Sequence, residues 1–192
     1  MSELWKTPDL PAPDRKMILR YARGGSGTGV SELLEDVIRE GVLAVKPKLC
    51  FAVLPVKLQG DLVVLNTISV RSRGFASFLS GCDRAVLFAA TVGAEADRLI
   101  SRAGTVSPAR ALLLDAFFTE RIEALCDRFT AQYDEPSRRF SPGYADLPLE
   151  FQKTIFPLLD CPRKIGLTLG DTLLMMPTKS VTAFIGLREG SL

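Results

Sequence analysis

RAVLFAATV, residues 84–92, is an almost unbroken apolar run that is followed by Gly93. An apolar run of this length, bounded by polar residues and a glycine, is typical of a strand in the middle of a sheet. We therefore predict a central strand at 84–92 and place the other elements around it.

Further strands are predicted on both sides of this run in the sequence. KLCFAVLPVKL (48–58) and DLVVLNTISV (61–70) are expected to be two strands that meet in a tight hairpin at Gln59-Gly60. Towards the C-terminus we expect a short strand at 164–170, a bend at 173–180 and a closing strand, VTAFIGL, at 181–187.

Helical periodicity is present in several other segments. Shorter helices are predicted at 14–23, 31–46, 74–82, 93–103 and 149–160. Asp14 is the expected N-cap of the first, Pro47 ends the second, and Pro157 is expected to interrupt the last. Between the first two helices lies GGSGTG (24–29), which lacks the Lys-Ser/Thr of a phosphate loop and follows a helix instead of a strand. We interpret it as a flexible connector.

The longest predicted helix is 107–133, where Ser107 is a good N-cap and Pro108 suits the first helical position. Beside its apolar seam, Asp115, Thr119 and Glu123 recur every four residues and therefore share one face. This row is either hydrogen-bonded or solvated structure, or a set of acceptors that faces a ligand. The sequence pattern leaves both interpretations open.

Helices and strands are mixed without a steady βαβ alternation, which favours an α+β fold with a mostly antiparallel sheet. We expect an N-terminal helix and glycine-rich connector in residues 1–30 and a single α+β domain in residues 31–192.

Composition limits the possible partners. The 24 Lys and Arg residues are balanced by 22 Asp and Glu residues, which argues against nucleic acid or an anionic membrane as the main partner. No apolar run approaches the roughly 18 residues of a membrane-spanning helix. The N-terminus lacks the cationic start and apolar stretch of a signal peptide, so we expect a cytoplasmic protein.

The sequence contains no histidine, which excludes Ser-His-Asp and Cys-His nucleophiles and the HExxH zinc site. The four cysteines are far apart and never form CxxC, so we expect reduced, buried thiols and no metal site. These exclusions favour a protein that binds and positions a molecule.

The segment RRFSPGYADLP, residues 138–148, combines turn residues with ligand-binding chemistry. Pro142-Gly143 predicts a type II turn, which by itself needs no ligand. Arg139 can hold a carboxylate through two parallel hydrogen bonds, Gly143 permits close backbone approach, and Tyr144 offers a ring face. A zwitterionic nucleoside such as S-adenosylmethionine would use all three, so the segment is either a well-formed turn or a ligand site.

Arg139-Phe-Ser-Pro-Gly-Tyr144 resembles the RxxPGY signature of the activation domain of cobalamin-dependent methionine synthase. The likeness continues in IGLTLGDTLLMMPTKSVTAFIGL (165–187), and the segments 88–100 and 112–129 resemble stand-alone, single-domain members of that family. The resemblance implies a curved α+β fold that cradles S-adenosylmethionine. In the family this ligand provides the methyl group for cob(II)alamin, while flavodoxin or another reductant supplies an electron.

The resemblance also implies roles for particular residues. Arg139 would hold the methionine carboxylate, Ser141 and Gly143 would offer backbone contacts, and Tyr144 would pack nearby. The family's N-terminal aspartate corresponds to Asp14, and its acidic helix residue to Glu123 or Glu120. A later tyrosine pair that touches the ligand in the family has no counterpart in this sequence.

The sequence shows no cobalamin, homocysteine or folate module, so cobalamin would be reached only through a partner. We expect that partner to be a methionine synthase that lacks this domain, and we expect no turnover by the protein alone. A related role with another corrinoid protein, or a scaffold that has lost the ligand, remains the alternative.

Overall fold

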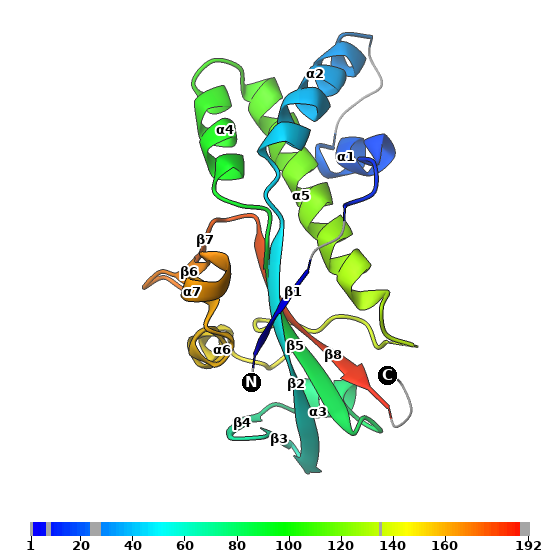
Figure 1. The fold of residues 1–192 in the computed structure, drawn as a ribbon, viewed down its shortest axis with the longest axis vertical. Coiled ribbons are helices and arrows are strands. Elements are labelled where there is room, and N and C mark those ends of the chain that lie inside the picture. The colour runs from blue at the N-terminus through cyan, green and yellow to red at the C-terminus, as the bar shows by residue number, and fades with distance from the viewer. Residues whose placement is uncertain (1, 7–8, 24–27, 135, 189–192) are drawn as a thin grey trace.

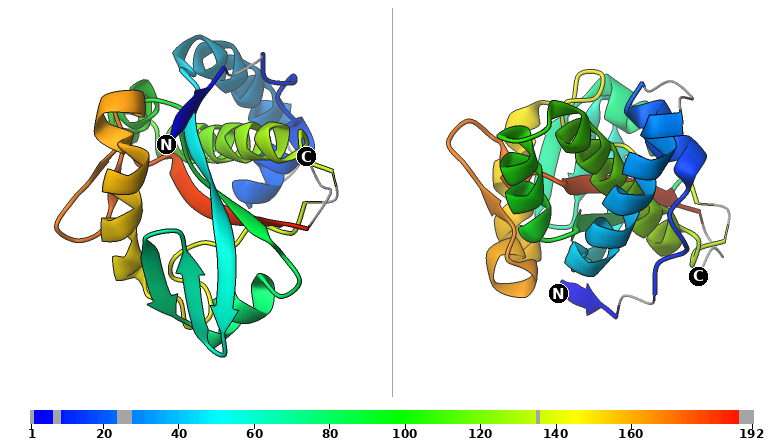
Figure 2. Two further views of the ribbon diagram at one scale, coloured as in Figure 1. Left: turned by 60° about the horizontal axis from the view of Figure 1, so that its bottom comes forward. Right: turned by 90° about the horizontal axis from the view of Figure 1, so that it is seen from above.

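The computed structural model describes residues 2–6, 9–23, 28–134 and 136–188. A curled antiparallel sheet has helices packed against both of its faces (Figures 1 and 2). The prediction of an α+β fold with a mostly antiparallel sheet is confirmed. The helices are α1 (Arg15–Tyr21), α2 (Thr28–Ala44), α3 (Arg73–Phe78), α4 (Glu95–Gly104), α5 (Pro108–Thr130), α6 (Gln152–Leu159) and α7 (Cys161–Ile165), with a 3₁₀ turn at Leu149–Phe151 before α6.

The main sheet is built around one long strand. Its order is β4-β3-β2-β5-β8, and β6 and β7 form a separate hairpin. β1 pairs with the beginning of β2, whereas β3 pairs with its end. All of these pairings are antiparallel. The strands are β1 (Glu3–Trp5), β2 (Lys48–Gln59), β3 (Leu62–Leu65), β4 (Ile68–Arg71), β5 (Arg84–Thr91), β6 (Thr168–Leu169), β7 (Met175–Met176) and β8 (Ser180–Leu187).

β5 lies between β2 and β8, as predicted for a central strand. Val86 and Phe88 pack into a core shared with α1, α2, α4 and α5, whereas Ala85 and Leu87 pack into a second core shared with α3, α6 and α7. Because successive side chains of a strand point to opposite faces, a strand covered on both faces must be apolar at every position. This arrangement explains the unbroken apolar run.

Several predicted boundaries are wrong. Residues 61–70 do not form one strand, because Asn66 adopts a left-handed conformation (φ 53°) and the chain turns between β3 and β4. Pro157 lies inside α6, and the break comes at Asp160 (φ 56°), after which α7 begins. Since α7 takes the first residues of the predicted strand 164–170, only Thr168–Leu169 are extended. Strand β1 was not predicted.

The N-terminal segment packs onto α5. The Asp14 carboxylate caps α1 as predicted, accepting from the backbone N–H groups of Lys16 and Met17. Ile18 is fully buried in the core that contains α5. The predicted connector residues 24–27 lie outside the described residues, and α2 begins at Thr28, three residues before the predicted start. The division of the chain near residue 30 stays a prediction.

A buried ion pair on α5 fastens this segment. Arg121 and Glu120 form the pair, and both side chains are at least nine-tenths buried. Arg121 also donates to the carbonyl oxygen of Pro11 (2.6 Å), and the Glu120 carboxylate accepts from the backbone N–H of Asp14 (3.2 Å). Both charged groups are therefore satisfied by the chain that precedes α1. Within the described residues, no helix is long and apolar enough to cross a membrane.

Candidate functional site

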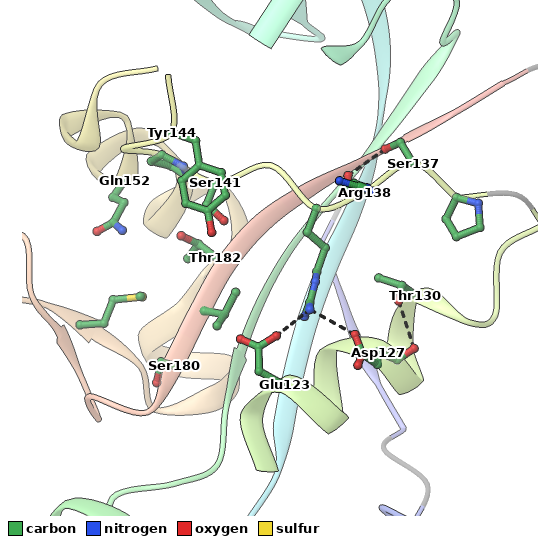
Figure 3. A pocket seen from close by; sticks show the side chains of 15 residues that line it. Glu123, Asp127, Thr130, Ser137, Arg138, Ser141, Tyr144, Gln152, Ser180 and Thr182 are labelled. Atoms are coloured by element: carbon green, nitrogen blue, oxygen red, sulfur yellow. Dashed lines mark hydrogen bonds and ion pairs between the residues drawn. The ribbon is translucent and has the colours of Figure 1, made fainter. Parts of the chain in front are cut away.

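A cavity of about 570 Å³ opens where the C-terminal half of α5, the segment 136–144 and the beginnings of α6 and β8 meet (Figure 3). Its volume is in the range of small-molecule sites, about 300–1,000 Å³. The lining is formed by Glu123, Asp127, Thr130, Pro136, Ser137, Arg138, Arg139, Ser141, Pro142, Tyr144, Gln152, Met175, Ser180, Val181 and Thr182.

The position of Arg139 follows from how its segment runs along the edge of β8. Phe140 and Phe184 exchange two backbone hydrogen bonds (3.0 and 2.7 Å), and the Ser137 hydroxyl accepts from the backbone N–H of Gly186 (2.7 Å). Phe140 stacks on Phe75 in the second core, with 5.4 Å between the ring centroids. Since neighbouring side chains of an extended segment point to opposite sides, Arg139 is directed towards α5.

Arg139 meets two carboxylates there. Its Nη2 lies 2.6 Å from Glu123 Oε2 and 3.1 Å from Asp127 Oδ1. Burial lowers the pKa of the Arg139 guanidinium, but its neighbours, Cys126 first and then Glu123 and Asp127, raise that pKa above its ordinary value. Burial also raises the pKa of the neighbouring Cys126 thiol to about 12, so that thiol stays neutral.

One nitrogen of Arg139 is left over. Nη1 is buried and has no hydrogen-bond partner in the structure. Leaving such a group unsatisfied costs about 1–3 kcal/mol, and more for a charged group. Arg139 is thus fixed by carboxylates through one nitrogen, while its second nitrogen is left without a hydrogen bond beside the cavity.

The predicted type II turn is confirmed. Gly143 has φ 91°, and the Tyr144 N–H donates to the Ser141 carbonyl (3.0 Å) across the turn. Ser141 and Tyr144 line the cavity, and the Tyr144 side chain is 57% exposed at its rim. Gly143 supplies the backbone conformation of the turn, and its N–H donates to the carbonyl oxygen of Leu147 (2.8 Å).

Asp146 anchors the turn to the start of α3. Its carboxylate accepts hydrogen bonds from the Ser72 hydroxyl (2.5 Å) and the N–H groups of Arg73 (2.8 Å) and Gly74 (2.9 Å) at the start of α3. These donors, the Ser72 hydroxyl first, lower the pKa of Asp146 to about 2. The contacts connect segments more than 70 residues apart and hold the Ser141–Tyr144 turn against the body of the protein.

The opposite side of the cavity carries two more unsatisfied groups. Gln152 Oε1 and Thr182 Oγ1 are buried without a hydrogen-bond partner. The backbone N–H and C=O of Phe184 point away from β5, towards Phe140. Because these groups point to the same edge at every second residue of a strand, the backbone groups of Thr182 also point away from β5. The backbone groups of Thr182 therefore point to the edge of β8 that borders the cavity.

The row on α5 divides between two partners. Lys179, which precedes β8, forms an ion pair with Asp115 (2.8 Å) and donates to the Thr119 hydroxyl (2.9 Å). Glu123 instead binds Arg139. The first two positions therefore hold the chain that leads into β8, and only the third faces the cavity.

The structure brings together four of the six predicted site residues. Glu123, Arg139, Ser141 and Tyr144 line one cavity, and Gly143 shapes its turn. Asp14 and the alternative Glu120 do not line it. Asp127 was missed although it lies one helical turn after Glu123, a spacing that could have identified it. Gln152 and Thr182 were also missed, and no sequence signal singles them out.

In the described segments, no group of three or more His, Cys, Asp or Glu side chains is placed to hold a metal ion. The four cysteines are free thiols, and Cys82 is only half-buried, unlike Cys50, Cys126 and Cys161. A cavity lined by an arginine, carboxylates and unsatisfied hydrogen-bonding groups has the chemistry to hold a small polar or zwitterionic molecule.

Comparisons with known proteins agree with the resemblance seen in the sequence. Residues 115–191 match the family described as vitamin B12 dependent methionine synthase, activation domain, and every residue that lines the cavity falls in this range. The fold is that of the MetH reactivation domain, whose crystal structure was solved bound to AdoHcy. The two structures superimpose with a TM-score of 0.67 at 19% sequence identity. The alignment covers 95% of this chain and 72% of the chain of the MetH reactivation domain. A search of curated proteins found no match.

Proposed function

We propose that this protein binds S-adenosylmethionine and supports the reductive methylation of cob(II)alamin in a cobalamin-dependent methionine synthase. The observation that carries the proposal is the buried, unpartnered Nη1 of Arg139 beside two carboxylates, in the part of the chain that matches the activation-domain family. The MetH reactivation domain of the same fold was solved with AdoHcy, the demethylated form of this ligand.

The charges in the cavity suit the amino-acid end of such a ligand. Its carboxylate would bind Arg139 Nη1, and its ammonium group would lie against Glu123 or Asp127. Arg139 Nη2 could keep its contacts with these carboxylates, so no existing ion pair would have to break. A carboxylate bound in this way would satisfy the guanidinium group that is unpartnered in the structure.

The chain's own residues would bind and orient the ligand, and S-adenosylmethionine would supply the methyl group. Without histidine, the protein has no imidazole acid or base, and transfer of a methyl group from a sulfonium needs none. Cobalamin would come with a methionine synthase that lacks this domain, and flavodoxin or another reductant would supply the electron. The contribution of the protein described here would be to position S-adenosylmethionine, which converts an encounter in solution into a reaction within a complex. We place this activity in the cytoplasm.

Isothermal titration calorimetry tests the proposal directly. We expect the protein to bind both S-adenosylmethionine and S-adenosylhomocysteine with a stoichiometry of one, and to show a higher Tm when either is present. Absence of binding to both ligands would refute the proposal and would favour a scaffold that keeps the fold alone. Binding without any effect on methionine synthase would favour another corrinoid protein as the partner.

A further inference from the structure

Two cysteines outside the cavity lie in contact with each other. Cys50 of β2 and Cys161, the first residue of α7, are both fully buried in the second core, where α7 packs against β2. Their side chains share a hydrogen bond, in which the Cys161 thiol donates to the Cys50 sulfur. Cys126 belongs to the first core, on the other face of the sheet, and Cys82 lies near Gly186 at the far end of β5.

The surroundings make the two thiols chemically different. The hydrogen bond from Cys161 lowers the pKa of the Cys50 thiol, an effect that burial opposes and the positive charge of Lys164 assists. The same hydrogen bond raises the pKa of Cys161, the donor. Since the thiolate is the reactive form of cysteine, Cys50 is the nucleophile of the pair and Cys161 is placed to react with it in a second step.

The short strand β1 controls access to Cys50. Leu4 of β1 is paired with Cys50 in register, and its side chain is 60% exposed. Ser2 holds the strand in place, because its hydroxyl accepts from Lys164 Nζ (2.6 Å) and donates to the carbonyl oxygen of Leu159 (3.1 Å). A strand of three residues at the edge of a sheet, with little apolar burial, opens locally at a low cost in free energy (Figure 1). Such an opening admits a molecule as small as hydrogen peroxide to Cys50.

We propose that Cys50 and Cys161 form a reversible redox pair, which a peroxide oxidises to a disulfide between β2 and α7. The Cys50 thiolate attacks one oxygen of hydrogen peroxide, the O–O bond breaks, and hydroxide leaves and takes up a proton to become water. The Cys161 sulfur then attacks the Cys50 sulfenic acid, the S–O bond breaks, and a second water leaves with the Cys161 proton. The two thiols lose two electrons, and one peroxide is reduced to two waters.

The folded structure permits this linkage without rearrangement of its elements. Thiols in hydrogen-bonding contact can close to a disulfide by rotation of the two side chains, while β2 and α7 stay in place. Cys50 and Cys161 are the farthest apart in sequence of the four cysteines. Because the entropy cost of closing a loop grows with its length, an unfolded chain would favour the nearer cysteine pairs instead.

Oxidation of the full chain with hydrogen peroxide tests the proposal. After treatment, the remaining thiols are alkylated in denaturant and counted by mass spectrometry. We expect two of the four thiols to become protected and dithiothreitol to restore all four. Peptide mapping without reduction should find Cys50 linked to Cys161 as the predominant disulfide. Retention of four reactive thiols, or oxidation without this linkage, would overturn the proposal in the wild-type protein alone.

Two controls show whether the fold selects the pair. Oxidation in urea should give mainly disulfides between nearer cysteines, and an equal yield of the Cys50–Cys161 linkage there would overturn the role of the folded structure. Cys161→Ala should lose the linkage, whereas Cys126→Ala, in the other core, is the matched variant and should keep it. A protein that binds no S-adenosylmethionine would still form this disulfide, so its failure to form and a failure of the proposed function are distinguished.

Discussion

Arg139 neutralises two carboxylates that lie one helical turn apart on α5. Arg139→Ala should weaken S-adenosylmethionine binding by roughly 1.5–3 kcal/mol, the scale of a hydrogen bond to a charged group. Arg139→Lys should recover only part of this loss, because an ammonium group cannot form the paired contact of a guanidinium. Calorimetric titration of each variant measures the change.

The control for Arg139 has to lie outside the cavity. Arg138 is exposed but belongs to the lining, so Arg128 on the outer face of α5 is the better choice. Arg128→Ala should bind like the wild-type protein, and we also expect Arg138→Ala to have little effect. Binding of wild-type strength by Arg139→Ala would show that the ligand carboxylate does not use this residue.

Gly143 has a positive φ of 91°, and a Cβ atom added there would meet only Leu149 Cδ1 at an ordinary 3.5 Å. Gly143→Ala should therefore act through backbone strain alone, about 1 kcal/mol or more. Because the turn lines the cavity at the surface and lies outside the core, we expect a clear loss of ligand affinity and only a small decrease in Tm. Calorimetry and thermal unfolding of the same preparation compare the two, and an unaltered affinity would contradict this prediction.

At the scale of elements, Asp146 joins the turn to α3, and its effect should depend on pH. Its pKa of about 2 in the folded protein is below the value of about 3.9 expected in an unfolded chain. Folding is therefore stabilised above about pH 4, and this stabilisation is lost as the pH falls towards 2. Asp146→Asn should flatten that part of the stability profile in urea unfolding.

Asp171 provides the control for this measurement, since it is an exposed aspartate between β6 and β7. Asp171→Asn should keep the wild-type dependence on pH. Should Asp146→Asn keep it as well, the hydrogen bonds to α3 would contribute nothing to acid stability.

The Glu120–Arg121 pair connects α5 to the segment before α1, and its removal should affect the whole fold. Arg121→Met leaves Glu120 buried without its cation, a change that typically costs about 3–5 kcal/mol. Arg128→Met, on the exposed face of the same helix, should change stability by less than about 0.5 kcal/mol. Urea unfolding would show the difference, and similar midpoints for both variants would mean that the N-terminal segment is held by apolar contacts alone.

At the scale of the whole molecule, the cavity lies beside the β8 edge of the sheet, and the ligand would be presented to a second protein. Alone, the protein should bind S-adenosylmethionine and release no product. With a cobalamin-bearing methionine synthase that lacks this domain, a reductant and S-adenosylmethionine, it should restore methylcobalamin from cob(II)alamin. The visible absorption spectrum reports this conversion.

Omitting the protein is the control for reactivation, and Arg139→Ala is the matched variant. Both should slow the return of methylcobalamin, because free S-adenosylmethionine lacks the positioning that the complex provides. The same rate with and without the protein, across several candidate synthases, would indicate another corrinoid partner or a scaffold.

The sequence by itself determined the features that depend on short-range chemistry. The apolar run 84–92 could be recognised as a buried strand, Ser107-Pro108 as the start of α5, and Pro142-Gly143 as a type II turn, because each pattern is contained within a few residues. The wrong predictions came from segments in which two local preferences compete. Asn66 adopts a left-handed turn inside a stretch that otherwise has strand character, and α6 continues past Pro157.

Only the tertiary structure decided how the cavity is assembled. Which acid of α5 meets Arg139 depends on the pairing of the segment 137–140 with the edge of β8, which fixes the side to which each side chain points. Gln152 and Thr182 carry no sequence signal because their importance lies in lacking a partner, a property that exists only after distant segments have packed together. Turn and helix chemistry is encoded locally, whereas unsatisfied hydrogen bonds are a consequence of the whole fold.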